Sequence, residues 1–305
     1  DSADPLVPYA ADDVIWAVTN ACTGPGREEQ AAALTVILQR RLTEGVGDWA
    51  RRRILRYLAV GAPEGADLAA VGALLRDASW REDARVTLER VNTAEARRLL
   101  VEAIDPEDPE FTTALLHALA QTRGAECNSP EVRACLHHDS AGVRAAAARA
   151  LAWTGDPTLE PLYQRLVESA TPDTRFEATD ALLRLADAMT KTGNWQLAMN
   201  MYLQVLASET DPILLRAAMM GLGRHGDESA IPAILEAALE ADPDLQAAAG
   251  AAIAMVPGRG AYKEIVVAYA SAPQAMRLPL LAEMGRRATP EMIPLLGDAA
   301  RSEDP

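Results

Sequence analysis

Three of the four histidines and two of the three cysteines lie in one window of the chain, and these residue types can bind zinc. The window contains His117, Cys127, Cys135, His137 and His138. Structural zinc takes four such ligands, usually supplied as closely spaced pairs. If two antiparallel helices carry these residues, His117 and Cys135 reach similar heights, whereas Cys127 and the histidine pair lie at opposite ends of the second helix. No zinc-type pair spacing occurs, so we expect buried thiols, surface histidines and no metal.

A disulfide between Cys127 and Cys135 is the alternative in an oxidising compartment. A helical turn between two such cysteines usually separates their Cα atoms by more than the limit of about 7 Å. Free thiols are therefore the favoured interpretation, and Cys22 would be the odd cysteine if the bond formed. Three cysteines cannot all pair within one chain, so the sequence does not describe a disulfide framework.

The remaining sequence contains no catalytic or cofactor signature. The nucleophile motif GxSxG, the zinc motif HExxH and the phosphate-binding and dinucleotide-binding glycine motifs are all missing from the sequence. Carboxylate pairs such as Asp12-Asp13 are typical of solvated helix turns. We therefore predict a protein that is not an enzyme and binds no cofactor.

The composition describes an acidic chain suited to helices. Hydrophobic residues make up 49% of the 305 residues and aromatic residues only 4%, and sheets favour more aromatic and β-branched side chains. The formal net charge of −15 disfavours nucleic acid and anionic membrane surfaces as partners. No apolar run is long enough for membrane insertion. We interpret the one basic run, Arg51-Arg52-Arg53, as a solvated helix face rather than an anion site.

The elements that carry these residues are helices of a repeated unit, whose clearest copy is residues 139–156. Asp139 or Ser140 can cap a helix. An apolar stripe then falls on one helical face, and it consists of Val143, Ala147, Ala150 and Leu151. Gly155 can end the helix in the left-handed conformation, and Asp156-Pro157 can begin the next one.

The same unit recurs about every 31 residues. An arginine of the first helix marks it at Arg53, Arg85, Arg144, Arg175, Arg216 and Arg277, with Thr113 and Gln246 at the same place in two units. Residues 1–10 are predicted to be an extended lead-in, followed by a capping pair at about 12–22 and 27–42. Eight further pairs are predicted at 49–60 with 65–76, 80–91 with 93–104, 108–122 with 130–137, 140–153 with 158–169, 172–191 with 194–208, 211–225 with 229–240, 243–255 with 260–271, and 273–287 with 290–301. Each hairpin must stack on its neighbours to bury its apolar stripe.

These units resemble the HEAT family, including the HEAT-like repeats of phycobilisome lyases. The motif Asp139-x-x-x-Val143-Arg144 with Ala147, Ala150 and Leu151 carries the resemblance, which extends over about 48–301. Residues 172–208 contain an insertion and resemble one tetratricopeptide hairpin. The resemblance implies an all-α, right-handed α-solenoid of about eight HEAT-like hairpins. We divide the chain into a lead-in with its capping pair, 1–47, and one continuous repeat domain, 48–305.

The function that we favour is a non-enzymatic scaffold that binds a protein partner, or another domain of its parent chain, on its concave face. The candidate partner-binding residues are Trp195, Tyr202 and Tyr163, with core packing as the alternative for both tyrosines. The alternative function is a ligand-handling or lyase-like accessory with a concave-face pocket. The chain begins at Asp1, so we expect a processed chain or an excised domain. A similarity of 48–104 to HEAT arrays of bacterial extracytoplasmic proteins favours a periplasmic or secreted location.

Overall fold

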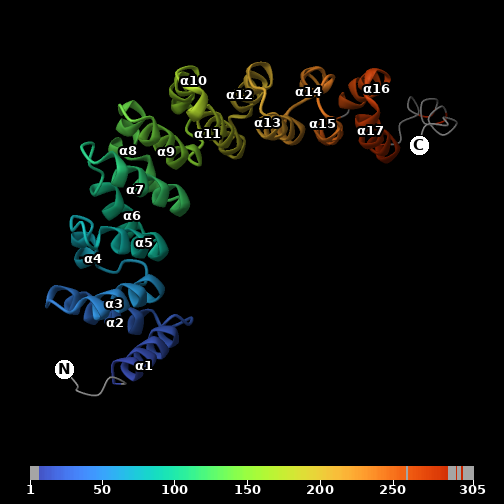
Figure 1. The fold of residues 1–305 in the computed structure, drawn as a ribbon. Helices are drawn as coiled ribbons and strands as arrows, with labels where there is room; N and C mark the ends of the chain where they lie inside the picture. The colour runs from blue at the N-terminus through green and yellow to red at the C-terminus, as the bar shows by residue number, and fades with distance from the viewer. Residues whose placement is uncertain (1–6, 259, 288–292, 294–296, 298–305) are drawn as a thin grey trace. The chain divides into compact units, whose positions relative to one another are not determined.

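The structure is a computed structural model that describes residues 7–258, 260–287, 293 and 297 (Figure 1). Helices account for its regular structure, and no strand occurs in these ranges. The chain forms two compact units that divide between Leu151 and Ala152. Each unit is a stack of antiparallel helical hairpins in two layers, which confirms the predicted all-α solenoid class. Its handedness and the continuity of the array across the two units stay predictions.

In the N-terminal unit, the first helix of each hairpin packs on the first helix of the next. One layer contains α1, α3, α5 and α7 in that order, and α2, α4 and α6 form the other. The helices are α1 (Val7–Cys22), α2 (Glu28–Thr43), α3 (Asp48–Gly61), α4 (Ala69–Leu74), α5 (Arg81–Val91), α6 (Ala94–Glu102), α7 (Pro109–Thr122), α8 (Pro130–Ala134) and α9 (Ala141–Ala152), which ends at the boundary. Short 3₁₀ turns at Ala125–Asn128 and Cys135–His137 flank α8.

The C-terminal unit repeats the arrangement. Its first layer contains α11, α13, α15 and α17, and its second contains α12, α14 and α16. The helices are α10 (Glu160–Glu168, after a 3₁₀ turn at Pro157–Leu159), α11 (Pro172–Lys191), α12 (Trp195–Ser208), α13 (Pro212–His225), α14 (Ala230–Ala238), α15 (Pro243–Met255), α16 (Ala261–Ser271) and α17 (Gln274–Arg287). The second helix predicted at 290–301 lies almost wholly outside the described residues.

Local sequence signals explain where the helices begin. Asp108, Asp211 and Asp242 each precede a proline, and each side chain accepts a hydrogen bond from a backbone N–H of the first turn. An aspartate cap satisfies N–H groups that have no partner within the helix, and proline at the first helical position has no N–H to satisfy. The repeated Asp-Pro dipeptide therefore fixes the start of the first helix in three hairpins.

Two expectations need correction. The helix predicted from Asp12 begins at Val7, with Pro8 in its first turn, so the extended lead-in does not reach residue 10. The second helices predicted at 65–76 and 130–137 are only six and five residues long in the structure. Helices α1 and α2 both pack on α3, as a capping pair would, and the division of the chain at residue 48 stays a prediction.

The cores are built from small side chains. Val143, Ala147, Ala150 and Leu151, the stripe predicted from the sequence, are all fully buried. In the C-terminal unit, a Cβ atom at Gly223 of α13 would lie 2.4 Å from the carbonyl oxygen of Ala252 in α15. Only a glycine permits this approach of two backbones. Small residues thus bring successive first helices close together.

Candidate functional site

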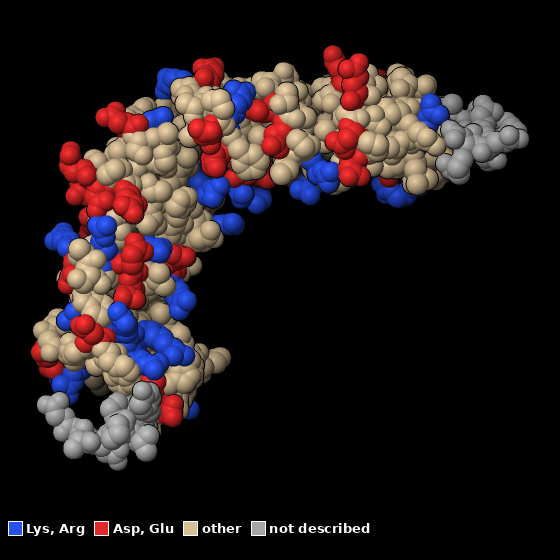
Figure 2. All heavy atoms as spheres, viewed as in Figure 1, with Lys and Arg blue, Asp and Glu red and all other residues tan. Residues whose placement is uncertain are grey.

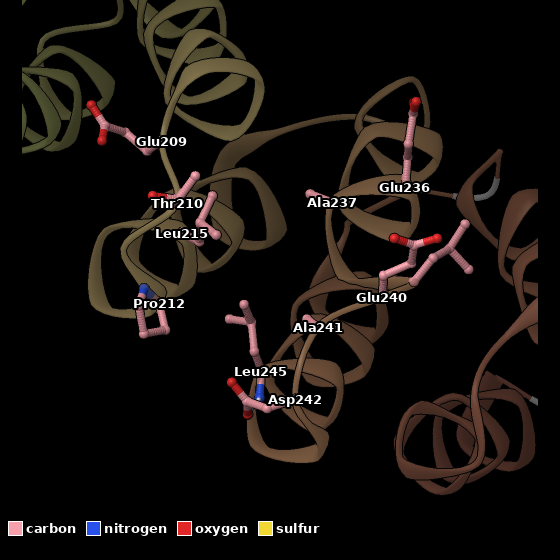
Figure 3. A pocket seen from close by; sticks show the side chains of 11 residues that line it. Glu209, Thr210, Pro212, Leu215, Glu236, Ala237, Glu240, Ala241, Asp242 and Leu245 are labelled. Atoms are coloured by element: carbon pink, nitrogen blue, oxygen red, sulfur yellow. Dashed lines mark hydrogen bonds between the residues drawn. The ribbon is translucent and has the colours of Figure 1, made fainter.

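A groove with a volume of about 580 Å³ lies in the C-terminal unit where two loops between hairpins meet. Figure 3 shows Pro212 and Leu215 on one side of the groove and Ala241, Asp242 and Leu245 on the other. The complete lining is Glu209, Thr210, Pro212, Leu215, Glu236, Ala237, Leu239, Glu240, Ala241, Asp242 and Leu245. Two Asp-Pro helix starts, one repeat apart, therefore place the lining residues opposite each other.

The base of the groove is apolar. Leu215 and Leu245 are 8% and 3% exposed, because each sits on the buried face of its own helix. Ala237 and Ala241 are half-buried beside them, whereas Leu239 remains 44% exposed at the rim. Such a base offers contact to an apolar side chain of a ligand.

The rim is acidic, and no lining residue is basic. Two of its four carboxylates are held by the fold. Oε1 of Glu209 accepts hydrogen bonds from Nε of Arg175 at 2.8 Å and from the hydroxyl of Thr179 at 2.9 Å. Asp242 accepts from the backbone N–H groups that begin α15. These two side chains therefore shape the groove more than they attract a ligand.

The other two carboxylates, Glu236 and Glu240, are exposed and lie four residues apart at the end of α14. Among the described residues, neither has a lysine or arginine within ion-pair distance. Both remain available to a cation from outside the chain. The arrangement can therefore bind a positively charged group next to an apolar one.

The structure corrects two of the three predicted partner-binding residues. Tyr163 and Tyr202 are 0% and 1% exposed, so both are core residues. The hydroxyl of Tyr202 donates to Oδ1 of Asp187, and burial together with this hydrogen bond raises the pKa of Tyr202. Its ring also packs directly on Gly221 of α13. Neither tyrosine can contact a partner unless the hairpins separate.

Trp195 is 49% exposed and stays a predicted contact residue. It begins α12, whereas the groove lies at the other end of that helix. The insertion at 172–208 lengthens this hairpin, since α11 has 20 residues and the next first helix, α13, has 14.

The overhanging ends of this hairpin mostly cover each other. Leu185 and Met189 of α11 are fully buried, and so is nearly all of Met199 in α12. The hydroxyl of Thr192 donates to the carbonyl oxygen of Gly155 at 3.2 Å, which ties the end of α11 to the preceding loop. The large apolar side chains that stay exposed at the start of α12 are Trp195 and Leu197, at 49% and 36%.

The histidines and cysteines of the first candidate site do not converge. Within the described part of the chain, no three His, Cys, Asp or Glu side chains form a group that could hold a metal. Cys127 is fully buried and its thiol donates to the carbonyl oxygen of Leu119 at 3.3 Å, while Cys135 is 5% exposed. Burial raises the thiol pKa of both, and all three cysteines are free.

The histidines have separate environments. Burial, followed by the charges of Arg149 and Arg85, lowers the pKa of His117. His138 links two loops, since its Nδ1 accepts from the backbone N–H of Ser140 and its Nε2 lies 3.0 Å from the carbonyl oxygen of Pro106. That pairing assigns the ring proton to Nε2. His138 therefore serves the loop structure.

The basic run in α3 lies in an environment that differs from the solvated helix face predicted from the sequence. Arg51 and Arg53 are half-buried rather than solvated, and the guanidinium group of Arg51 lies 4.7 Å from the ring centre of Trp80. Trp49 and Trp80 lie one repeat length apart near the starts of successive first helices. The spacing of the two tryptophans was the sequence signal that could have revealed the contact between Arg51 and Trp80.

Stacked helical hairpins of about 31 residues place the chain in the class of α-solenoid repeat proteins. The profile for HEAT repeats matches residues 98–183, and the profile for the PBS lyase HEAT-like repeat matches residues 214–240. These two segments therefore contain HEAT and HEAT-like repeats, as their motifs predicted. A comparison with curated proteins gives no match. The second matched segment spans α13 and α14 and includes five residues that line the groove.

Proposed function

We propose that this chain is a non-enzymatic scaffold whose C-terminal groove binds a segment of a protein partner, or of another domain of its parent chain. The observation that carries the proposal is the groove itself, with its apolar base and two carboxylates that have no cationic partner among the residues the structure describes. HEAT repeats generally serve as interaction surfaces, which supports the same class of function. The proposed binding site is one groove, whereas the sequence led us to expect binding on the concave face as a whole.

The shape and charge of the groove favour a particular kind of segment. A volume of about 580 Å³ lies within the range of about 300–1,000 Å³ that is typical of ligand sites. A lysine or arginine can pair with Glu236 or Glu240, while a neighbouring apolar side chain contacts Leu215 and Leu245. Complementary charge of this kind gives specificity and faster association more than affinity alone.

The test is the binding of a labelled peptide of alternating lysine and leucine to the full chain. We expect the double variant Glu236→Lys with Glu240→Lys to weaken binding by about tenfold or more, because two attractions become repulsions. The matched control is Glu168→Lys with Glu177→Lys, which makes the same change of charge on exposed positions outside the groove. An equal loss of peptide affinity in both double variants would show that net charge alone causes the loss. It would refute the groove as the binding site.

The lyase-like alternative is favoured by one observation, the match of 214–240 to the PBS lyase HEAT-like repeat. A ligand-handling accessory needs a site that encloses a small molecule, whereas this groove is open along its rim. Binding of a bilin to the wild-type chain, in competition with the peptide, would support the alternative.

A further inference from the structure

Helix α3 presents an unusually basic face to solvent. Its four arginines against the single carboxylate of Asp48 give the helix a net charge of +3, in a chain whose net charge is −15. Figure 2 shows basic side chains gathered in the N-terminal unit near α3. We define the α3 arginine face as Arg51, Arg52, Arg53 and Arg56.

Tryptophan rings hold these guanidinium groups in place. Arg51 and Arg52 lie 4.7 and 5.6 Å from the ring centre of Trp80, which begins the next hairpin. Arg53 lies 5.4 Å from the ring centre of Trp49. Cation–π contacts of this kind fix the plane of the guanidinium group and leave its N–H edges available.

The preceding hairpin completes the arrangement. Arg56 lies 4.5 Å from the ring centre of Trp16 in α1, and that ring in turn contacts Tyr57 of α3. Three successive first helices thus contribute to one ordered surface. Their side chains have already lost much of their conformational freedom, which lowers the entropic cost of binding a ligand.

Among the described residues, most of the face lacks the carboxylates that neutralise several other arginines of this unit. Arg81, Arg85, Arg97 and Arg98 each form an ion pair with an aspartate or glutamate. Of the α3 arginines, Arg53 pairs with Asp12 at 3.2 Å. Within the described residues, Arg51, Arg52 and Arg56 have no carboxylate within ion-pair distance, and Nε of Arg51 is buried without a hydrogen-bond partner.

This contrast matters because acidic residues outnumber basic ones by 44 to 29 in the whole sequence. Like charges four residues apart, as in Arg52 and Arg56, are mildly unfavourable on a helix. A face that keeps them without carboxylates is suited to receiving carboxylates from another molecule.

We propose that the α3 arginine face binds an acidic segment of a protein partner. Carboxylates of the segment pair with Arg52 and Arg56, and separate apolar side chains contact Trp49 near the start of the helix and Val60 near its end, which are 45% and 43% exposed. A protein segment fits better than nucleic acid, because the basic surface is one helix long and the rest of the chain repels phosphate. The α3 arginine face is basic and lies in the N-terminal unit, whereas the groove is acidic and lies in the C-terminal unit. The proposal therefore does not depend on the proposed function.

The test uses the full chain and a labelled peptide of alternating glutamate and leucine. We expect Arg52→Glu with Arg56→Glu to weaken binding by about tenfold or more, and high salt to weaken it in the wild type. The matched control is Arg76→Glu with Arg90→Glu, two exposed arginines of the same unit, which should bind nearly as the wild type does. Arg52→Lys with Arg56→Lys keeps the charge but loses the planar guanidinium group, so it should give an intermediate loss with an unchanged melting temperature.

Several outcomes would overturn the proposal. Absence of binding, or an equal loss in the arginine-face and control variants, would show that the face is not a specific site. Tighter binding of a single-stranded oligonucleotide than of the acidic peptide would assign the face to nucleic acid. The groove variant Glu236→Lys with Glu240→Lys should leave acidic-peptide binding unchanged, which separates this test from that of the groove.

Discussion

The contact between Tyr202 and Gly221 can be tested by a double-mutant cycle. A Cβ atom at Gly221 would lie 2.4 Å from two ring atoms of Tyr202, so Gly221→Ala must displace a fully buried ring. Overpacking of this kind costs about 1–3 kcal/mol, whereas alanine in place of glycine favours the helix by about 1 kcal/mol. We therefore expect a net destabilisation of up to about 2 kcal/mol.

The second arm of the cycle removes the ring. Tyr202→Ala should destabilise the hairpin by about 3–5 kcal/mol, as for other large aromatic core residues. In that background the methyl group of Gly221→Ala enters vacant space, so the substitution should become neutral or stabilise by about 1 kcal/mol. The two changes should thus be coupled by about 1–3 kcal/mol.

Hydrogen exchange of the segments that cover α12 and α13 is the suitable assay, because a repeat array opens in parts. A change of about 1.4 kcal/mol in the free energy of local opening alters the exchange rate about tenfold. If Gly221→Ala has the same effect in both backgrounds, the ring does not pack on Gly221. The placement of the Tyr202 ring in the core against α13 would then be wrong.

Two further predictions concern buried polar groups. Cys127 and Cys135 should react with Ellman's reagent much more slowly than half-buried Cys22 in the native chain, because burial raises their thiol pKa; equal rates would contradict their burial. Since the folded state favours the protonated thiols, this contribution to stability should be complete below about pH 8.5 and be lost as the pH rises through the folded pKa. Arg175→Ala leaves the carboxylate of Glu209, whose side chain is 6% exposed, without its guanidinium partner, and should destabilise the α11–α13 region by about 1–3 kcal/mol. Arg175→Lys should recover part of that loss in the same exchange assay, and no loss in Arg175→Ala would show that the ion pair does not stabilise the hairpin.

Local signals made most of the fold predictable from the sequence. Asp-Pro dipeptides, the recurring arginine and the apolar stripes depend on residues within one helix or turn, and these predicted the helical hairpins correctly. The short helices α4 and α8 were overestimated because apolar spacing continues into neighbouring turns, where hydrogen bonds no longer follow the α-helical pattern.

The surfaces were harder to predict because they depend on neighbouring hairpins. The side of α12 that faces the core is decided by its contacts with α11 and α13, so the sequence could not distinguish buried Tyr202 from exposed Trp195. The groove requires Leu215 and Leu245, one repeat apart, to lie across two loops. The contact of Arg51 with Trp80 likewise joins two repeats, and periodicity alone does not reveal which side chains meet.

The central claim is that the C-terminal groove receives a protein segment. The most direct measurement is hydrogen exchange of the full chain, alone and in complex with a partner purified from its native host. We predict that binding slows exchange mainly in the two segments that form the groove, residues 209–215 and 236–245. Unchanged exchange in both segments, with protection only elsewhere in the chain, would contradict the claim.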